Sequence, residues 1–361
     1  MLRSMPDLNA VDHRNDPAHW AAKLDISTEA VELYLDSEIV DLHNDLYVPA
    51  RLYGYKVHRR HGLGLSRGIF FSHSDLPRLR EARLSCTVFD IATNPLRRGR
   101  NRATVAIKNI ERITSDLAQH PTEMCLVKNH SEYTAAREKG LMGCYLGIQG
   151  GQAFQYDRSS MEAIPNSVHR ITLVHLTNSQ IGTTSSPLGR SGNGLSNRGE
   201  QLVEIMNHKR ILVDLAHIDR AGFMHAAEVH NKSQPLICTH TGVDGALEHW
   251  RNIDDEQIIT VTQTGGTVGV IFHSAFLDGG IGRCDPERVL DHMEHVINVA
   301  GDEHVSIGTD YDGLIIPPRG LREVTDMPRL VQMMLNRNWP ELRIRRTLGL
   351  NALRVFKEIR P

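Results

Sequence analysis

The sequence repeats one pattern, a run of apolar residues that ends in a histidine or an aspartate. The first run, Glu38–Asp45, reads EIVDLHND and ends by presenting His43 and Asp45 two residues apart. In a strand, residues i and i+2 point to the same face, so this imidazole and this carboxylate would converge on one point. That geometry suits a metal ion, although a single pair of this kind is also compatible with a solvated strand end.

The same pattern recurs along the chain. Three later runs also end in such a residue: Ile211–His217, Pro235–His240 and His304–Asp310. Four further apolar segments resemble strands: Leu84–Ile91, Leu141–Ile148, Arg170–His175 and Thr267–His273. The total of about eight segments is the number that a (β/α)8 barrel requires.

Segments with helical spacing of apolar residues lie between these runs. They are Thr104–Leu117, Gly199–Asn207, Asp219–His230 and Asp285–Val299. Strands that alternate with helices predict a parallel sheet, either closed into a barrel or open and doubly wound. In a barrel, residues from distant strand ends meet above the C-terminal rim, whereas an open sheet spreads them along a line.

We therefore predict an α/β fold, a (β/α)8 TIM-type barrel. The prediction is a single domain over residues 1–361, with an N-terminal extension at 1–36 and the barrel at about 37–358. Long βα loops are expected at residues 47–75 and 185–197, which either face a substrate or simply connect elements at the surface.

The composition narrows the class of protein. The 361 residues carry a formal net charge of −2, with 40% hydrophobic and 23% charged residues, as in ordinary globular proteins. No long basic run is present, so we expect no nucleic-acid partner. The polar N-terminus and the lack of a stretch of about 18 apolar residues predict neither a signal peptide nor a membrane span. Five scattered cysteines without CxxC spacing predict free thiols and a cytoplasmic location.

Several ordered motifs resemble those of one family. They are Asp41–Asp45 (DLHND), Ser74–Glu81 (SDLPRLRE), Gly194–Ser196 (GLS) with Met206–Asn207 and Asp214–His217 (DLAH), Ile307–Gly313 (IGTDYDG) and Asn351–Phe356 (NALRVF). From about Asp41 to Phe356 the chain is similar to the membrane (renal) dipeptidase family, zinc peptidases with an amidohydrolase-like barrel. The resemblance implies a small-molecule or dipeptide substrate, one or two zinc ions per chain, and a homo-oligomer, expected to be a dimer.

The resemblance also implies a set of metal ligands. His43 and Asp45 would hold one ion and His217 and His240 the other, and imidazole and carboxylate are the usual zinc ligands of open catalytic sites. Gln149 stands at the position of the ligand that bridges the two ions.

Three more residues acquire roles through the resemblance. His175 would contact the substrate carbonyl and stabilise the oxyanion. Arg251 would bind the terminal carboxylate through a bidentate fork, the alternative being an ordinary surface arginine. Asp310 would bind substrate and carry the proton from the attacking water to the leaving amine, whereas we interpret Asp312 as a structural turn residue.

One departure from the family pattern affects the chemistry. Where the family has a bridging glutamate, this chain reads Gly147-Ile148-Gln149-Gly150-Gly151. Gln149 is neutral and offers a single good ligand oxygen. Two divalent ions about 3.5–4 Å apart repel each other, and a bridging anion offsets that repulsion.

These residues favour a metal-dependent, dipeptidase-like hydrolase that cleaves a small amide or dipeptide with a free carboxylate. Two alternatives remain open because of Gln149. One is a catalytically impaired homologue that acts as a binding protein. The other is a one-metal enzyme that acts on a specialised metabolite.

Overall fold

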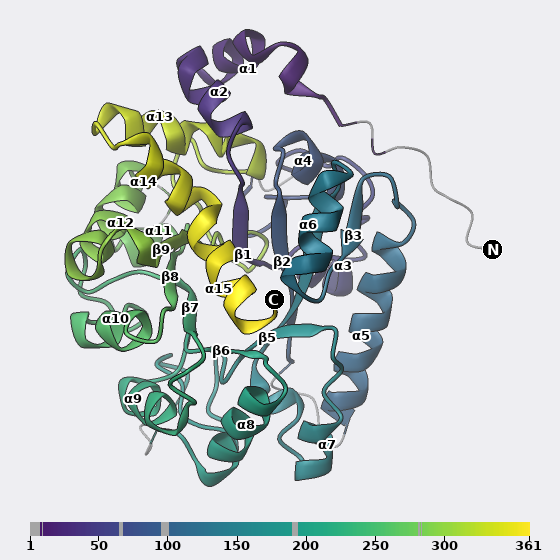
Figure 1. Ribbon diagram of the computed structural model, residues 1–361, viewed down its shortest axis with the longest axis vertical. Coiled ribbons are helices and arrows are strands. Elements are labelled where there is room, and N and C mark those ends of the chain that lie inside the picture. Colours follow the sequence, from purple (N-terminus) through teal and green to yellow (C-terminus); the bar gives the residue numbers. More distant parts are fainter. Residues whose placement is uncertain are drawn as a thin grey trace.

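The core of the molecule is a closed parallel barrel (Figure 1). The computed structural model describes residue 8 and residues 10–64, 68–94, 101–189, 194–280, 282 and 284–361. Its strands are β1 (Val40–Asn44), β2 (Cys86–Ala92), β3 (Met124–Leu126), β4 (Met142–Gln149), β5 (Val168–Thr172), β6 (Leu212–Asp214), β7 (Leu236–Thr241), β8 (Thr267–Val270) and β9 (Val305–Ile307). β1 pairs with β2 and β9, and β2 pairs with β4, so eight strands close into a ring. The predicted (β/α)8 barrel is confirmed.

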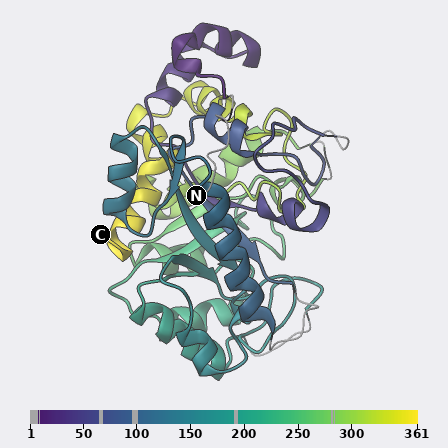
Figure 2. The same ribbon diagram turned by 90° about the vertical axis from the view of Figure 1, so that its right-hand side faces the viewer.

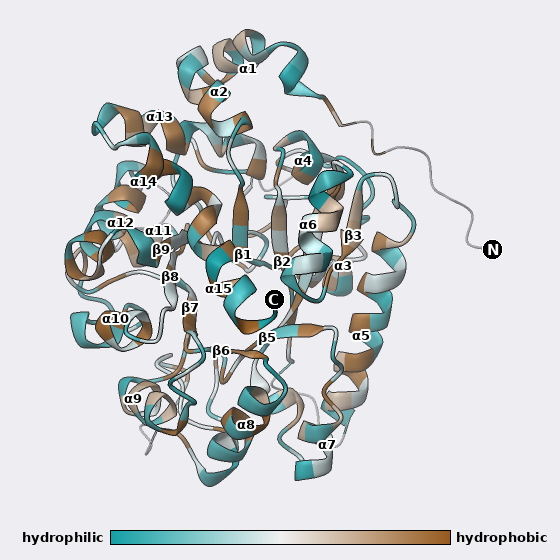
Figure 3. Cartoon of the chain, viewed as in Figure 1, coloured by the Kyte–Doolittle hydropathy of each residue, from teal (hydrophilic) through white to brown (hydrophobic). Residues whose placement is uncertain are grey.

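Helices surround the ring, and Figure 3 shows that they carry both polar and apolar residues. The α-helices are α1 (Pro17–Leu24), α2 (Thr28–Leu35), α3 (Tyr47–Tyr53), α4 (Leu76–Glu81), α5 (Arg102–Leu117), α6 (His130–Glu138), α7 (Arg158–Glu162), α8 (Asn197–His208), α9 (Arg220–Val229), α10 (Asp255–Thr262), α11 (Ser274–Leu277), α12 (Glu287–Ala300), α13 (Pro328–Asn336), α14 (Glu341–Arg345) and α15 (Asn351–Ile359). Short turns of 3₁₀ helix are η1 (His13–Asn15), η3 (Gly151–Ala153), η4 (Asp302–His304) and η5 (Val324–Asp326), and η6 (Arg346–Leu350) is a π-helical turn.

The helix periodicity explains why these segments pack on the barrel. In α5 the buried residues are Ala106, Ile110, Ile113 and Leu117, which follow one face at helical spacing. The four predicted helices correspond to α5, α8, α9 and α12. Strand β3 was not predicted; it has three residues and, among the described strands, pairs only with β4, outside the ring.

The N-terminal end of the barrel is closed. Val40, Leu42, Tyr145 and other inward residues form an apolar cluster with Phe356 and its neighbours on α15. Figure 1 shows α15 lying across this end of the barrel. Access to the interior is therefore from the opposite end, where the strands terminate.

The N-terminal helices α1 and α2 lie at one end of the molecule, beyond the barrel strands (Figures 1 and 2), and α2 packs against α13. Residues 1–7 and 9 of the predicted extension, and residues 65–67 and 190–193 of the two predicted loops, lie outside the described residues. Among the helices that the structure describes, none combines the length and the apolar character needed to cross a membrane.

Asp312 anchors a loop to the C-terminal end of the barrel, in agreement with its interpretation as a structural residue. It is fully buried and adopts a positive φ of 67°. Its carboxylate accepts hydrogen bonds from the backbone N–H groups of Ser72, His73 and Ser74, at 2.7–3.1 Å, and from the Ser74 hydroxyl at 2.6 Å. These bonds tie the segment before α4 to the turn after β9.

We expect Asp312→Ala to lower the free energy of unfolding by about 3 kcal/mol or more, because it leaves several buried donors without an acceptor. Asp25→Ala is a matched control, since Asp25 also has a positive φ (54°) but is exposed. It should cost less than about 1 kcal/mol. Urea denaturation measures both values, and similar losses in the two variants would contradict the anchoring role.

Candidate metal centre and substrate cavity

All eight residues predicted for the site lie at the C-terminal end of the barrel. His43, Gln149 and His240 belong to β1, β4 and β7. The others follow strands: Asp45 follows β1, His175 follows β5, His217 follows β6, Arg251 follows β7 and Asp310 follows β9. Because parallel strands end on one rim, residues far apart in sequence meet there.

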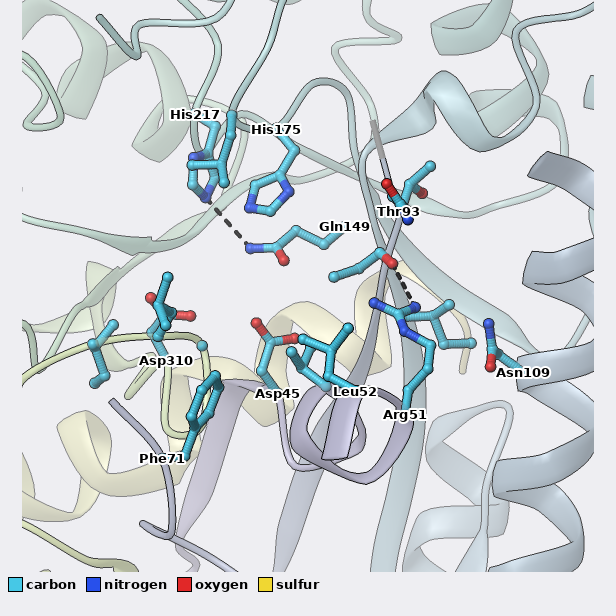
Figure 4. A pocket seen from close by; sticks show the side chains of 18 of the residues that line it. Asp45, Arg51, Leu52, Phe71, Thr93, Asn109, Gln149, His175, His217 and Asp310 are labelled. Carbon is cyan, nitrogen blue, oxygen red and sulfur yellow. Dashed lines mark hydrogen bonds between the residues drawn. The ribbon is translucent and has the colours of Figure 1, made fainter. Parts of the chain in front are cut away.

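Three imidazole nitrogens converge on the amide of Gln149. Its Nε2 lies 3.2 Å from His43 Nε2 and 3.4 Å from both His217 Nε2 and His240 Nε2. The two latter nitrogens are 2.8 Å apart, and the rings of His43 and His240 stack with centroids 3.7 Å apart. Figure 4 shows Gln149 extending toward His217.

Two carboxylates complete this group. Asp45 Oδ2 lies 3.7 Å and Asp310 Oδ1 3.4 Å from His43 Nε2. One atom each of His43, His240 and Asp310 lie within 4.8 Å of one another, so a cation held by the imidazoles would also lie close to Asp310. His217 and Asp310 reach the site through left-handed backbone conformations, with φ values of 70° and 59°. Such strain in non-glycine residues is typical of functional sites.

The pKa values of the histidines differ with their surroundings. Burial lowers the pKa of His217 and of His240 well below the usual range, which keeps both rings neutral. Burial also disfavours charge on His43, but Asp90 and Asp45 outweigh it and raise the pKa of His43 to about 10. Carboxylates that favour a proton at this position also favour a metal cation.

A buried polar network beneath the site was not predicted. Asp90 Oδ2 lies 3.0 Å from His43 Nδ1 and also pairs with Arg170. Arg170 donates from Nη1 to Asp214 at 3.1 Å, and the Thr239 hydroxyl links Asp214, at 2.7 Å, to His240 Nδ1, at 2.8 Å. These contacts fix the rings of His43 and His240 with Nε2 directed toward the cavity.

Gly147 makes room for this network. A Cβ atom at this position would lie 2.5 Å from Asp90 Oδ1 and 2.8 Å from Arg170 Nη2. Any larger residue would therefore displace the ion pair that supports His43. The signal in the sequence was a charged residue within a strand, Asp90 in β2 and Arg170 in β5.

The site opens into a cavity of about 640 Å³. Asp45, Gln149, His175, His217 and Asp310 line its floor, and Figure 4 shows them facing a common space. Burial lowers the pKa of His175 to about 3 and raises the pKa of Asp310 well above its usual range. His175 is therefore a neutral ring, while Asp310 retains a proton more readily than an exposed aspartate.

Arg251 lies beside this group rather than on the surface. Its side chain is 3% exposed, and its Nη2 donates to the carbonyl oxygen of His240 at 2.6 Å. Its Nε has no hydrogen-bond partner in the described part of the chain, although Arg251 lines the cavity. A buried guanidinium with a remaining donor can bind an anion in the cavity.

The donor set fits a metal ion. The Nε2 atoms of His217 and His240 lie 2.8 Å apart although burial keeps both rings neutral, and a cation can be held by two such lone pairs. Asp45 Oδ1 and Gln149 Oε1 have no hydrogen-bond partner among the described residues. Exchange of the two amide atoms of Gln149 would direct its oxygen at the three rings. His43 with Asp45, and His217 with His240, could then each hold a divalent cation, with Gln149 as a neutral contact.

Comparisons with known proteins agree with this geometry. The dipeptidase verJ of Clonostachys rogersoniana is 27% identical over 343 residues, which cover 92% of this chain and 87% of that protein. The structure of the probable dipeptidase PvdM from Pseudomonas aeruginosa has a TM-score of 0.79 at 15% identity, covering 94% of this chain and 98% of that one. A metallopeptidase from Rhodobacter sphaeroides, liganded with a phosphinate mimic of L-Ala-D-Ala, has a TM-score of 0.76 at 22% identity, covering 90% and 100%.

The family comparison covers most of the chain. The family model described as membrane dipeptidase, peptidase family M19, matches residues 27–361. This range contains every strand of the barrel and all eight predicted site residues. The chain is a metal-dependent, dipeptidase-like hydrolase and belongs to the membrane dipeptidase family.

Proposed function

We propose that the protein hydrolyses dipeptides, or similar small amides, that carry a free carboxylate. The observation that carries this proposal is the position of Arg251 beside His240, at the edge of the cavity whose floor holds the histidine and carboxylate group. The guanidinium that would bind the carboxylate and the group that would hydrolyse the amide are therefore close enough for one small substrate to contact both. The experiment that tests the proposal is a hydrolysis assay with a panel of L,L and L,D dipeptides.

Each residue of the site has a separate role in the proposed reaction. His43 and Asp45 would hold one divalent ion, and His217 and His240 could hold a second. The bound metal would supply positive charge that polarises the carbonyl and eases deprotonation of water. His175, a neutral ring at the cavity floor, donates a hydrogen bond to the carbonyl oxygen as negative charge develops on it. Asp310 accepts the proton of the attacking water and transfers it to the departing amine. The raised pKa of Asp310 supports this role, since the group has to hold a proton between the two steps.

We further propose zinc as the ion, since a mixed imidazole and carboxylate set suits it. We expect one firmly held ion, because Gln149 contributes no charge.

The proposed cytoplasmic location rests on five free cysteines, four of them buried. A single domain is supported by the family match at 27–361, which runs from α2 to α15, and the proposed homodimer rests on resemblance to the family.

We expect Arg251→Ala to raise KM for a dipeptide with a free carboxylate by about 10-fold to 100-fold, because it removes a charge-assisted contact. The amidated form of the same dipeptide should lose much less. Arg251→Lys keeps the positive charge but not the bidentate geometry. Its KM for the free-carboxylate dipeptide should therefore lie between that of the unmodified protein and that of Arg251→Ala. Steady-state kinetics on both substrates decides the matter, and equal losses on them would refute carboxylate binding by Arg251.

A further inference from the structure

We propose that the cavity takes substrates whose amino-terminal residue carries a large apolar or aromatic side chain, held against Leu52, Tyr53 and Phe71. This inference rests on the proposed function and specifies its substrate class. Leu52 and Tyr53 form the last turn of α3, directly after the strand that carries His43 and close to Asp45.

The mouth of the cavity is unusually apolar. Thirteen large apolar side chains are exposed in the part of the chain that the structure describes, and five of them line this one cavity. They are Leu52, Tyr53, Leu176, Trp250 and Leu314, which are between 38% and 70% exposed. Large apolar residues scattered singly are normal, whereas a group around an opening is typical of a ligand-binding site.

The polar residues of the site fix the direction of the substrate. With the carboxylate at Arg251, the scissile amide lies over the imidazole group and the amino-terminal residue extends toward Asp45. Leu52 and Phe71 both line the cavity and lie on either side of Asp45 in Figure 4. The rings of Tyr53 and Phe71 meet edge to face with centroids 5.4 Å apart, so together they form a continuous aromatic wall.

The size of the cavity agrees with a bulky side chain. Its volume of about 640 Å³ lies in the range of sites that enclose drug-sized ligands. A substrate as small as Ala-Ala would leave the aromatic wall in contact with water. A phenylalanine at the amino-terminal position would bury this wall and gain hydrophobic free energy.

Paired substrates and variants test the inference. We expect the unmodified protein to hydrolyse Phe-Ala with a kcat/KM at least about tenfold above that for Ala-Ala. In Leu52→Ser/Tyr53→Ser this ratio should fall below about threefold. Leu342→Ser is the matched control, because Leu342 is 55% exposed, close to the 56% of Leu52, but lies on α14 outside the cavity. It should retain the ratio of the unmodified protein.

Binding of phosphinate analogues of the same two dipeptides, measured by calorimetry, separates this inference from the proposed function. Hydrolysis without preference in the unmodified protein would overturn the inference and leave the function standing. Absent hydrolysis, with a Kd preference for the phenylalanine analogue that the double variant loses, would overturn the function alone. If the double substitution instead dissociates a dimer and leaves the ratio unchanged, the apolar residues form a subunit interface and the inference is wrong.

Discussion

Replacement of Asp310 by asparagine is expected to lower kcat for dipeptide hydrolysis by about a hundredfold to ten-thousandfold, while the metal content stays nearly unchanged. The reason is that asparagine keeps the shape of the side chain but cannot accept a proton. Asp310 lies at the cavity floor, with Oδ1 3.4 Å from His43 Nε2, and Oδ1 has no hydrogen-bond partner among the described residues. Steady-state kinetics and elemental analysis of the purified variant measure the two quantities.

Asp45→Asn provides the comparison for this variant. Asp45 offers its carboxylate to the same group at 3.7 Å from His43 Nε2, and we assign it to metal binding. Its variant should lose activity together with metal. If Asp310→Asn also loses its metal, Asp310 is a ligand and the proton-transfer role is wrong.

Gln149→Glu is expected to raise the affinity for a second metal ion by at least about tenfold, because it adds a negative charge at the point where the imidazoles converge. The unmodified protein should hold one ion firmly and the second weakly or not at all. The firmer site should be the one with Asp45, the only anion among the residues assigned to metal binding. Dipeptide hydrolysis should rise with second-ion occupancy if the other groups are poised for catalysis.

Metal titration followed by elemental analysis tests this prediction. Gln152→Glu is a suitable control, since Gln152 is as buried as Gln149, at 2% exposure, but does not line the cavity. The control should not change second-ion binding. Two tightly bound ions in the unmodified protein would show that the site tolerates the missing charge.

The pattern of strands and helices predicted the barrel because each segment shows the apolar pattern that is typical of its own secondary structure. The eight predicted segments correspond to β1, β2 and β4 to β9, with ends that differ by a few residues. For example, β5 ends at Thr172 and leaves His175 in the loop, where the chain can turn the ring toward the cavity. The motif resemblance then identified the residues that the structure brings together.

Other features depend on contacts between distant segments, which the sequence of one segment does not reveal. The sequence shows Asp90, Arg170 and Asp214 only as single charges in three separate strands, while the barrel joins them into one network. The apolar mouth likewise combines residues from α3 and from the loops after β5, β7 and β9. Loop conformation and tertiary packing, rather than the periodicity of the sequence, determine which of these residues become neighbours.

The most direct test of the account is a zinc titration of the metal-stripped protein, with bound metal and dipeptide hydrolysis followed in the same samples. We predict that hydrolysis appears with the first equivalent of zinc and is abolished in His240→Ala, which removes a converging imidazole. Firm binding of zinc without hydrolysis of any dipeptide in the panel, at any loading, would contradict the proposal that this site is a working dipeptidase centre.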